Sequence, residues 1–168
     1  MADGIAENTR TNTCFNAALD QVCAKFGIRE IREEQRKAIE MFFEGKDVFV
    51  SLPTGYGKSF IFQAIPVIAS LLWKKPCTVF IVSPLKALME DQVLYLNSLG
   101  FKAVALNEEA DDGVIERVMN GEYSHVYGSP ESFLAQDKWR GVFTSNTFKE
   151  HLVGVAVDEA HCISHWYV

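Results

Sequence analysis

A glycine-rich loop carries a lysine and a hydroxyl side chain at a spacing that suits phosphate binding. Residues 52–59 have the sequence LPTGYGKS, with Thr54, Gly55, Tyr56, Gly57, Lys58 and Ser59 at its end. Glycines allow a backbone to turn around a phosphate without Cβ clashes, so that successive N–H groups can point inward. In this pattern Lys58 can reach the β- and γ-phosphates of a nucleotide, and the Ser59 hydroxyl can bind Mg²⁺.

The surroundings of this segment, which we call the lysine loop, favour that chemistry. Asp47–Leu52 is an apolar run that predicts a buried strand, and an apolar stretch typical of a helix follows the loop. A helix N-terminus at that point would add its positive dipole end. The match is incomplete, because Leu52 stands where the general pattern has glycine. The alternative is a chance glycine-rich turn with a surface lysine, which the predicted strand–turn–helix context disfavours.

A second candidate for chemistry is the acidic pair Asp158–Glu159, which follows the apolar run Leu152–Val157. Such a pair can divide two tasks. Asp158 can hold the Mg²⁺ shell, and Glu159 can orient or activate an attacking water. In a parallel sheet the pair would emerge at the carboxyl edge of the strands, where ligands bind. The alternative is a solvated strand end, and the lysine loop upstream favours the catalytic interpretation.

Alternating helices and strands must position these two segments. We expect residues 1–12 to be a disordered N-terminus and residues 13–168 to form one α/β domain with a mainly parallel sheet covered on both faces. Helical spacing predicts helices over Thr13–Phe26, Arg32–Phe43 and Leu85–Leu99, each followed by glycine. Besides the segment before the lysine loop, the predicted strands are Thr78–Ser83, Lys102–Leu106, Ser124–Tyr127 and Leu152–Val157.

Composition narrows the classes of function. The chain has 168 residues, 48% of them hydrophobic and 23% charged, which is typical of a globular protein. The longest apolar stretch, Ile61–Trp73, is too short and too interrupted to span a bilayer, and Met1–Asn16 lacks the pattern of a secretory signal. We therefore expect an intracellular protein. The net charge of −6 disfavours a standalone, high-affinity nucleic-acid binder, but it leaves room for a local basic groove.

The cysteines predict no disulfide framework and no zinc site. Cys14, Cys23, Cys77 and Cys162 include no Cys-x-x-Cys pair, and we expect them to pack as small apolar groups. The segment His161–His165 offers histidine and cysteine side chains. Because a closed zinc site needs four ligands and only this one short segment supplies any, we do not favour a metal centre there.

The ordered set of motifs resembles the RecQ-type helicases of superfamily 2, in their DEAH-box form, over about residues 19–168. The lysine loop is similar to the Pro-Thr-Gly-x-Gly-Lys-Ser variant used by that superfamily. The other motifs are Phe26-Gly27-x-x-x-x-Arg32-x-x-Gln35, Ser83-Pro84-Leu85-x-x-Leu88-Met89-x-Asp91-Gln92-Val93, Ser129-Pro130-Glu131 and Asp158-Glu159-Ala160-His161-Cys162-Ile163-Ser164-x-Trp166. The resemblance implies a RecA-like first motor domain that uses ATP and Mg²⁺, acts on single-stranded or forked DNA, and is a monomer.

The resemblance also implies roles at the adenine pocket. Gln35 would pair with N6 and N7 of adenine, and Arg32 would support the same pocket. The family usually has an aromatic ring at the position of Ile28, on which adenine stacks. Since Ile28 offers apolar contact but no π-face, we expect weaker nucleotide selectivity.

The remaining implied roles concern DNA. The resemblance suggests contacts with the DNA backbone near the ends of two strands, and an aromatic loop that couples DNA binding to ATP hydrolysis. Lys86 is equally consistent with a solvated helix lysine, and Trp166 with ordinary packing. His165 stands where the family often has glutamine, so the coupling loop is altered. The candidate nucleic-acid residues are Ser83, Lys86, Gln92, Ser129 and Trp166, and His161 is the candidate coupling residue.

The position at which the sequence stops gives two expectations. No second motor domain and no arginine finger follow Val168, so we expect this chain alone to hydrolyse ATP negligibly and to unwind nothing. The family also has a further strand between the lysine-loop strand and the Asp158–Glu159 strand. Without that strand we expect marginal stability, aggregation or rescue by a partner strand.

Two functions remain open from the sequence. The first is a DNA-dependent ATPase piece of a helicase, nuclear if the source is eukaryotic and connected with DNA repair and recombination. The second is a non-enzymatic module that regulates or competes with a full-length helicase. The presence of Lys58, Ser59, Asp158 and Glu159 together favours the first, because a binding module has no chemical need for all four.

Overall fold

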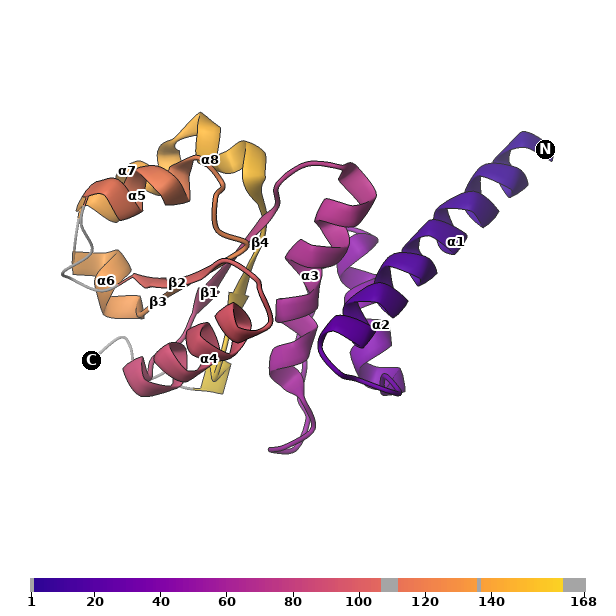
Figure 1. The fold of residues 1–168 in the computed structure, drawn as a ribbon, viewed down its shortest axis with the longest axis horizontal. Helices are drawn as coiled ribbons and strands as arrows, with labels where there is room; N and C mark the ends of the chain where they lie inside the picture. Colours follow the sequence, from indigo (N-terminus) through magenta and orange to yellow (C-terminus); the bar gives the residue numbers. More distant parts are fainter. Residues whose placement is uncertain (1, 107–111, 136, 162–168) are drawn as a thin grey trace. The chain divides into compact units, whose positions relative to one another are not determined.

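The computed structural model describes residues 2–106, 112–135 and 137–161. Contacts within the chain divide it into two compact units, Met1–Lys75 and Pro76–Val168. The first unit is built from helices, and the second contains a sheet with helices around it (Figure 1). The fold is therefore α/β, as the sequence predicts.

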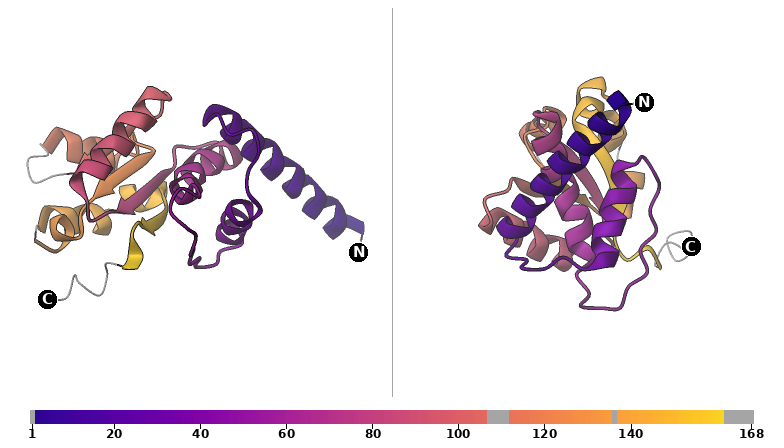
Figure 2. Two further views of the ribbon diagram at one scale, coloured as in Figure 1. Left: turned by 90° about the horizontal axis from the view of Figure 1, so that it is seen from below. Right: turned by 90° about the vertical axis from the view of Figure 1, so that its right-hand side faces the viewer.

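Three helices form the first unit: α1 (Ala2–Lys25), α2 (Glu33–Phe43) and α3 (Lys58–Trp73). α1 is one continuous helix in both views of Figure 2, and it begins upstream of the predicted start at Thr13. Whether residues 1–12 lie outside the domain stays a prediction. α3 packs against α1 and α2, and each of the three helices has a fully buried side chain: Leu19, Ile39 and Ile68.

Glycines end the first two helices at the predicted places. Gly27 follows α1 with a φ of +69°, and the Ile28 N–H donates to the Cys23 carbonyl at 2.8 Å, which closes the last turn. Gly45 follows α2 with a φ of +78° and donates to the Phe42 carbonyl. Glycine adopts a positive φ readily because it has no Cβ. The predicted ends of these two helices are therefore confirmed.

The predicted strand over Asp47–Leu52 is wrong. Among the described residues of the first unit there is no strand, and this segment is irregular backbone. Its most apolar side chain, Phe49, is 83% exposed. Apolar composition is not sufficient for a strand, because a strand also needs a neighbour to receive its N–H and C=O groups.

Among its described residues, the second unit contains a parallel sheet of four strands in the order β2-β3-β1-β4. The strands are β1 (Thr78–Val82), β2 (Ala103–Leu106), β3 (His125–Gly128) and β4 (Leu152–Val157). Phe80 in β1 is level with Val126 in β3 and with Val155 in β4. The strand predictions for these four segments are confirmed to within one residue at each end.

Helices cover both faces of this sheet (Figure 1). α4 (Lys86–Ser98) lies on one face, where its Gln92 meets Tyr127 of β3. The opposite face carries a core of Phe80, Val126 and residues of α5 (Asp112–Met119), α7 (Asp137–Thr144) and α8 (Asn146–His151). The short α6 (Pro130–Ala135) follows β3 directly. Burial on both faces explains why β1 is a nearly continuous apolar run.

β4 lies at one edge of the described sheet, and two of its apolar side chains are exposed to solvent. Val155 is 56% exposed and Val157 is 41% exposed, whereas every residue of β3 is buried. An exposed apolar edge strand is prone to pair with other chains. Within the described part of the chain, no helix is both long enough and apolar enough to cross a membrane.

We predict that Phe148→Ala lowers the free energy of unfolding of the chain by about 3–5 kcal/mol, because Phe148 is fully buried in the core beneath β1. Urea denaturation followed by circular dichroism measures this change. Leu94→Ala is the control, since Leu94 is 69% exposed on α4 and should change stability by less than about 0.5 kcal/mol. Equal losses from the two variants would contradict the packing described for the second unit.

We also predict that iodoacetamide at pH 8 modifies Cys14 faster than Cys23. Cys14 is exposed on α1, whereas burial, and then the nearby Asp20 carboxylate, raises the pKa of the Cys23 thiol. A raised pKa lowers the thiolate fraction at a given pH, so the gap in rates should narrow as the pH rises. Peptide mapping by mass spectrometry measures both rates. Faster labelling of Cys23 would contradict the burial of that face of α1.

Candidate nucleotide-binding site

The lysine loop forms a tight turn that leads directly into α3. Gly55 and Gly57 have φ values of +81° and +74°, and Gly57 is the N-cap residue of the helix that begins at Lys58. The Tyr56 N–H donates to the Pro53 carbonyl at 3.3 Å, which closes the turn. The sequence therefore predicted the turn and the helix after it correctly. The preceding segment, however, is irregular backbone instead of a strand.

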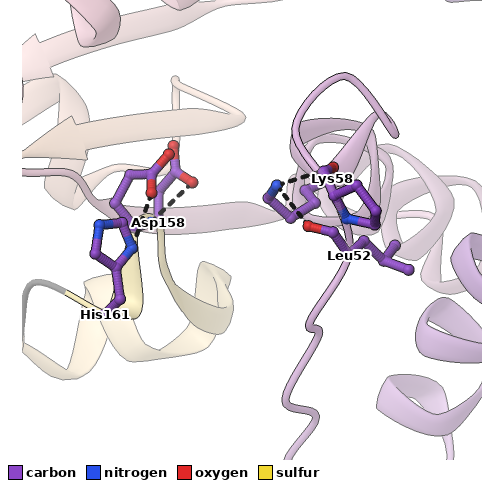
Figure 3. A network of polar contacts seen from close by, with 6 residues as sticks. Leu52, Lys58, Asp158 and His161 are labelled. Atoms are coloured by element: carbon purple, nitrogen blue, oxygen red, sulfur yellow. Dashed lines mark hydrogen bonds and ion pairs between the residues drawn. The ribbon is translucent and has the colours of Figure 1, made fainter.

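Lys58 points back across its own loop. Its Nζ donates to the carbonyls of Leu52 at 3.0 Å and Pro53 at 3.3 Å, as the right-hand part of Figure 3 shows. Ser59 is half-buried in the first turn of α3. An ammonium group held by neutral carbonyls loses little when an anion replaces them, because charge-assisted hydrogen bonds are the stronger kind. The first turn of α3 can therefore receive a phosphate.

Gln35 and Arg32 lie directly against this loop. The Gln35 side chain is buried, and its Nε2 donates to the Tyr56 carbonyl at 3.1 Å and the Gly57 carbonyl at 3.0 Å. Its Oε1 accepts from the Arg32 backbone N–H at 3.1 Å, which caps α2. The Arg32 guanidinium lies 4.2 Å from the centre of the Tyr56 ring. The structure thus brings together the residues predicted for the adenine pocket and the phosphate loop, although their roles stay predictions.

The contact between Arg32 and Tyr56 could not be found from the sequence. Tyr56 occupies a loop position that the phosphate-binding pattern leaves unspecified, and nothing in its spacing indicates a partner 24 residues earlier. Cation–π contacts leave no periodic mark in a sequence. The one indication of this contact in the sequence was Tyr56 itself, an aromatic residue in a loop whose turn does not require one. Ile28, which the resemblance assigns to the same pocket, is half-buried after α1.

In the second unit, Asp158 and Glu159 follow β4 as predicted. The Asp158 N–H donates to the Val82 carbonyl at 2.8 Å, so the pair is fixed to β1 by the last bond of the ladder. Asp158 is buried, and its Oδ1 accepts from the Glu159 N–H at 3.0 Å. Glu159 has a φ of +52°, an uncommon conformation for a residue with a side chain. Such local strain is often found at functional turns.

His161 contacts this acidic pair. Its Nδ1 lies 3.1 Å from Glu159 Oε2, as the left-hand part of Figure 3 shows, and its ring is exposed. The contact joins His161 to Glu159, although the coupling role of His161 stays a prediction. The rest of the proposed coupling segment, including His165 and Trp166, lies outside the described residues, as does Cys162.

Two of the residues predicted to contact nucleic acid lie at the same sheet edge. Ser83 follows β1, Ser129 follows β3, and the Ser83 N–H donates to the Gly128 carbonyl at 3.0 Å. The Ser83 hydroxyl is buried and, within the described part of the chain, has no hydrogen-bond partner. The Ser129 hydroxyl lies 3.1 Å from that of Ser132, which sequence reasoning missed. This edge therefore carries buried hydroxyl groups.

The other two described candidates differ in exposure. Lys86 is exposed at the first position of α4, where a phosphate could reach it. Gln92 is buried, and its Oε1 accepts a hydrogen bond of 2.8 Å from the Tyr127 hydroxyl. Gln92 thus joins α4 to β3, a role that its motif position did not indicate.

The lysine loop belongs to the first unit and the Asp158–Glu159 pair to the second. Their convergence on one ligand stays a prediction. Each is held by hydrogen bonds from its own unit: the Gln35 side chain holds the lysine loop, and the Val82 carbonyl holds Asp158.

The sequence of the chain matches the DEAD/DEAH box helicase family over residues 32–168. It is 32% identical over 153 residues to the RecQ-like DNA helicase blm-1 of Caenorhabditis elegans, covering 88% of this chain and 15% of that protein. It is 35% identical over 159 residues to the ATP-dependent DNA helicase RecQ of Pasteurella multocida, covering 89% of this chain and 22% of that protein. The chain thus spans less than a quarter of the length of either relative.

A solved structure has a similar fold. The DUF1998 helicase MrfA, crystallised with DNA and AMPPNP, superposes with a TM-score of 0.68 over 86% of this chain and 21% of its own, at 19% sequence identity. At that identity the likeness shows the fold alone. The match that covers both the lysine loop and the acidic pair carries the assignment: this chain belongs to the DEAD/DEAH box helicase family, and its relatives are RecQ-type helicases.

Proposed function

We propose that this chain is the ATP-binding first motor domain of a RecQ-like DNA helicase, which couples ATP hydrolysis to strand separation in the complete protein. The observation that carries the proposal is the lysine loop at the start of α3. Two glycines with positive φ, an ammonium group directed across the loop, and a buried amide against it form a unit suited to a nucleotide. The relatives named above, which are ATP-dependent or RecQ-like DNA helicases, support the same function.

In the proposed site the residues divide the work. Backbone N–H groups of Thr54–Gly57 and the N-terminus of α3 bind the phosphates, and Lys58 neutralises the β- and γ-phosphates. Arg32 and Gln35 receive the adenine. Glu159 orients the attacking water, while Asp158 helps to hold the metal.

A magnesium ion fits the donors that the sequence offers. The Ser59 hydroxyl and the Asp158 carboxylate would hold it, and Mg²⁺ prefers such hard oxygen donors together with substrate phosphates and water. When bound, the ion neutralises charge that develops on the phosphate oxygens. We propose that Lys58 and the Asp158–Glu159 pair act on the same magnesium-bound triphosphate.

For DNA, we propose contacts with the phosphate backbone of a single-stranded or forked substrate. Ser83, Lys86 and Ser129 would bind phosphate, with Gln92 supporting α4 from its buried position. Trp166 would stack on a base, and His161 would transmit that contact to Glu159, which it touches. Action in DNA repair or recombination, in the nucleus of a eukaryotic cell, follows from the same proposal.

We predict that Lys58→Ala weakens binding of a fluorescent ATP analogue about 10- to 100-fold, because the variant loses charge-assisted hydrogen bonds to the phosphates. Fluorescence titration of the purified chain measures the dissociation constant. Lys37→Ala, which removes an exposed lysine of α2, is the control and should bind as the parent does. If both lysine variants bind the analogue equally well, the lysine loop is not the phosphate site.

We further predict that Glu159→Gln leaves binding of that analogue within about twofold of the parent, since the side chain acts on water and not on the bound phosphates. We expect these 168 residues, assayed as an isolated polypeptide, to hydrolyse ATP roughly 10³-fold or more slowly than a complete helicase, because the proposal assigns the transition-state arginine to a second motor domain. Phosphate-release assays with and without single-stranded DNA measure this. Strand-separating turnover by the isolated chain would overturn the requirement for a second domain.

A further inference from the structure

The C-terminal end of α3 presents an exposed tryptophan next to two lysines. Trp73, the last residue of α3, is 49% exposed, and Lys74 and Lys75 directly after it are exposed as well. We call these three residues, all in the first unit, the Trp73 corner. Because α3 has 16 residues and is therefore about 24 Å long, the corner lies at the far end of the helix from the lysine loop (Figure 1).

Neighbouring aromatic rings anchor the Trp73 ring. The Phe43 ring meets it edge to face, with the ring centres 6.2 Å apart, and Phe43 in turn contacts Phe15 and Phe42. The Lys75 Nζ lies 5.9 Å from the centre of the Trp73 ring, at the outer limit of a cation–π contact. The ring is thus held by its neighbours while half of its surface stays open to solvent.

Lys74 adopts a backbone conformation that favours glycine. Its φ is +54°, and its N–H donates to the Ser70 carbonyl at 3.1 Å, which ends α3. The helices α1, α2 and α4 are instead followed by glycines with φ values of +69° to +79°, namely Gly27, Gly45 and Gly100. Lysine is less favourable than glycine in this conformation because it has a Cβ. Such strain is common where a side chain has a function.

The sequence around the Trp73 corner carries one sign of charge. Residues 48–89 contain no aspartate and no glutamate, and their four lysines are Lys58, Lys74, Lys75 and Lys86. Glu44, which follows Phe43 at the end of α2, is paired with Lys46 at 2.6 Å. Local positive charge in a chain with a net charge of −6 favours an anionic ligand at this corner.

We propose that the Trp73 corner binds single-stranded nucleic acid, with a base stacked on the Trp73 ring and phosphates on Lys74 and Lys75. An aromatic face beside cations suits a strand of any sequence, because every base has a π-face and every nucleotide has a phosphate. A stacked base interacts more strongly with the ring than a distant ammonium does, so the base displaces the Lys75 Nζ toward a phosphate. An acidic peptide would offer charge but no base.

This contact is additional to those proposed for Ser83, Lys86 and Ser129, which belong to the second unit. It uses none of the residues of the proposed nucleotide site. The two sites can therefore be tested separately in the same polypeptide.

The first test separates stacking from charge. Fluorescence anisotropy of these 168 residues, assayed as an isolated polypeptide, measures binding of labelled oligo-dT and of an abasic oligomer of equal length. Trp73→Leu keeps an apolar contact with Phe43 but has no π-face. It should weaken oligo-dT binding roughly fivefold or more, because one stacked base is lost, and leave binding of the abasic oligomer within about twofold of the parent. Trp73→Phe, which keeps a ring, should recover most of the binding.

The second test separates binding from stability. Lys74→Gly removes the ammonium and also relieves the backbone, so its urea midpoint should not fall. It should weaken binding of both oligomers and lower the slope of log K against log salt by about 0.7, the value for one phosphate contact on a single strand. A purely structural Lys74 would give a lower midpoint with unchanged binding. Lys37→Gln, at an exposed position of α2, is the control and should change neither.

The outcomes distinguish this site from the proposed function. If Lys86→Gln weakens oligo-dT binding but Trp73→Leu and Lys74→Gly do not, the Trp73 corner alone is overturned. Competition by poly-glutamate as effective as that by oligo-dT of equal charge would also overturn it, because stacking would then contribute nothing. If the polypeptide binds an ATP analogue but no oligo-dT, the corner fails and the nucleotide site stands. If it binds neither, both proposals fail.

Discussion

The backbone hydrogen bonds of β1 are the constraint on which the second unit depends. β1 has β3 on one side and β4 on the other, so its N–H and C=O groups have partners on both sides. Because parallel strands place their carboxyl ends at one edge, Ser83, Ser129 and Asp158 all emerge at that edge. The bond from the Asp158 N–H to the Val82 carbonyl is the last of this ladder. The position of the acidic pair is thus a consequence of strand pairing.

In the first unit, one side chain holds the lysine loop. One buried side chain, Gln35, caps α2 with its oxygen and holds the loop with its nitrogen. Two observations require glycine at position 57: its φ is positive, and Gln35 leaves no room for a Cβ. The loop that is suited to phosphate is therefore held by the residue that is predicted to recognise the base.

The sequence predicted those features of the fold and of the site that nearby residues determine. Gly27, Gly45 and Gly100 end their helices with φ near +70° to +80°, and each is visible as a glycine after a periodic apolar pattern. β1 was predictable because its residues are nearly all buried, which favours a nearly continuous apolar run. The acidic pair and the turn of the lysine loop followed from equally local patterns.

The features that the sequence did not predict depend on residues that are far apart in the chain. Asp47–Leu52 has the composition of a strand, but whether it forms one depends on a neighbour that its own residues do not specify. The stacking of Arg32 on Tyr56 and the bond from Tyr127 to Gln92 join residues 24 and 35 positions apart, with no periodic spacing. Side chains with two possible roles, such as Gln92, could be assigned to a surface or to a core only after the packing of α4 was known.

The most direct test of this account is a crystal structure of the chain with magnesium and a non-hydrolysable ATP analogue. The account predicts Lys58 Nζ within hydrogen-bond distance of the β- and γ-phosphates and the Asp158 carboxylate in the coordination shell of the same metal ion, directly or through a water. A bound analogue whose phosphates contact Lys58 while Asp158 and Glu159 lie on another face of the molecule would contradict it.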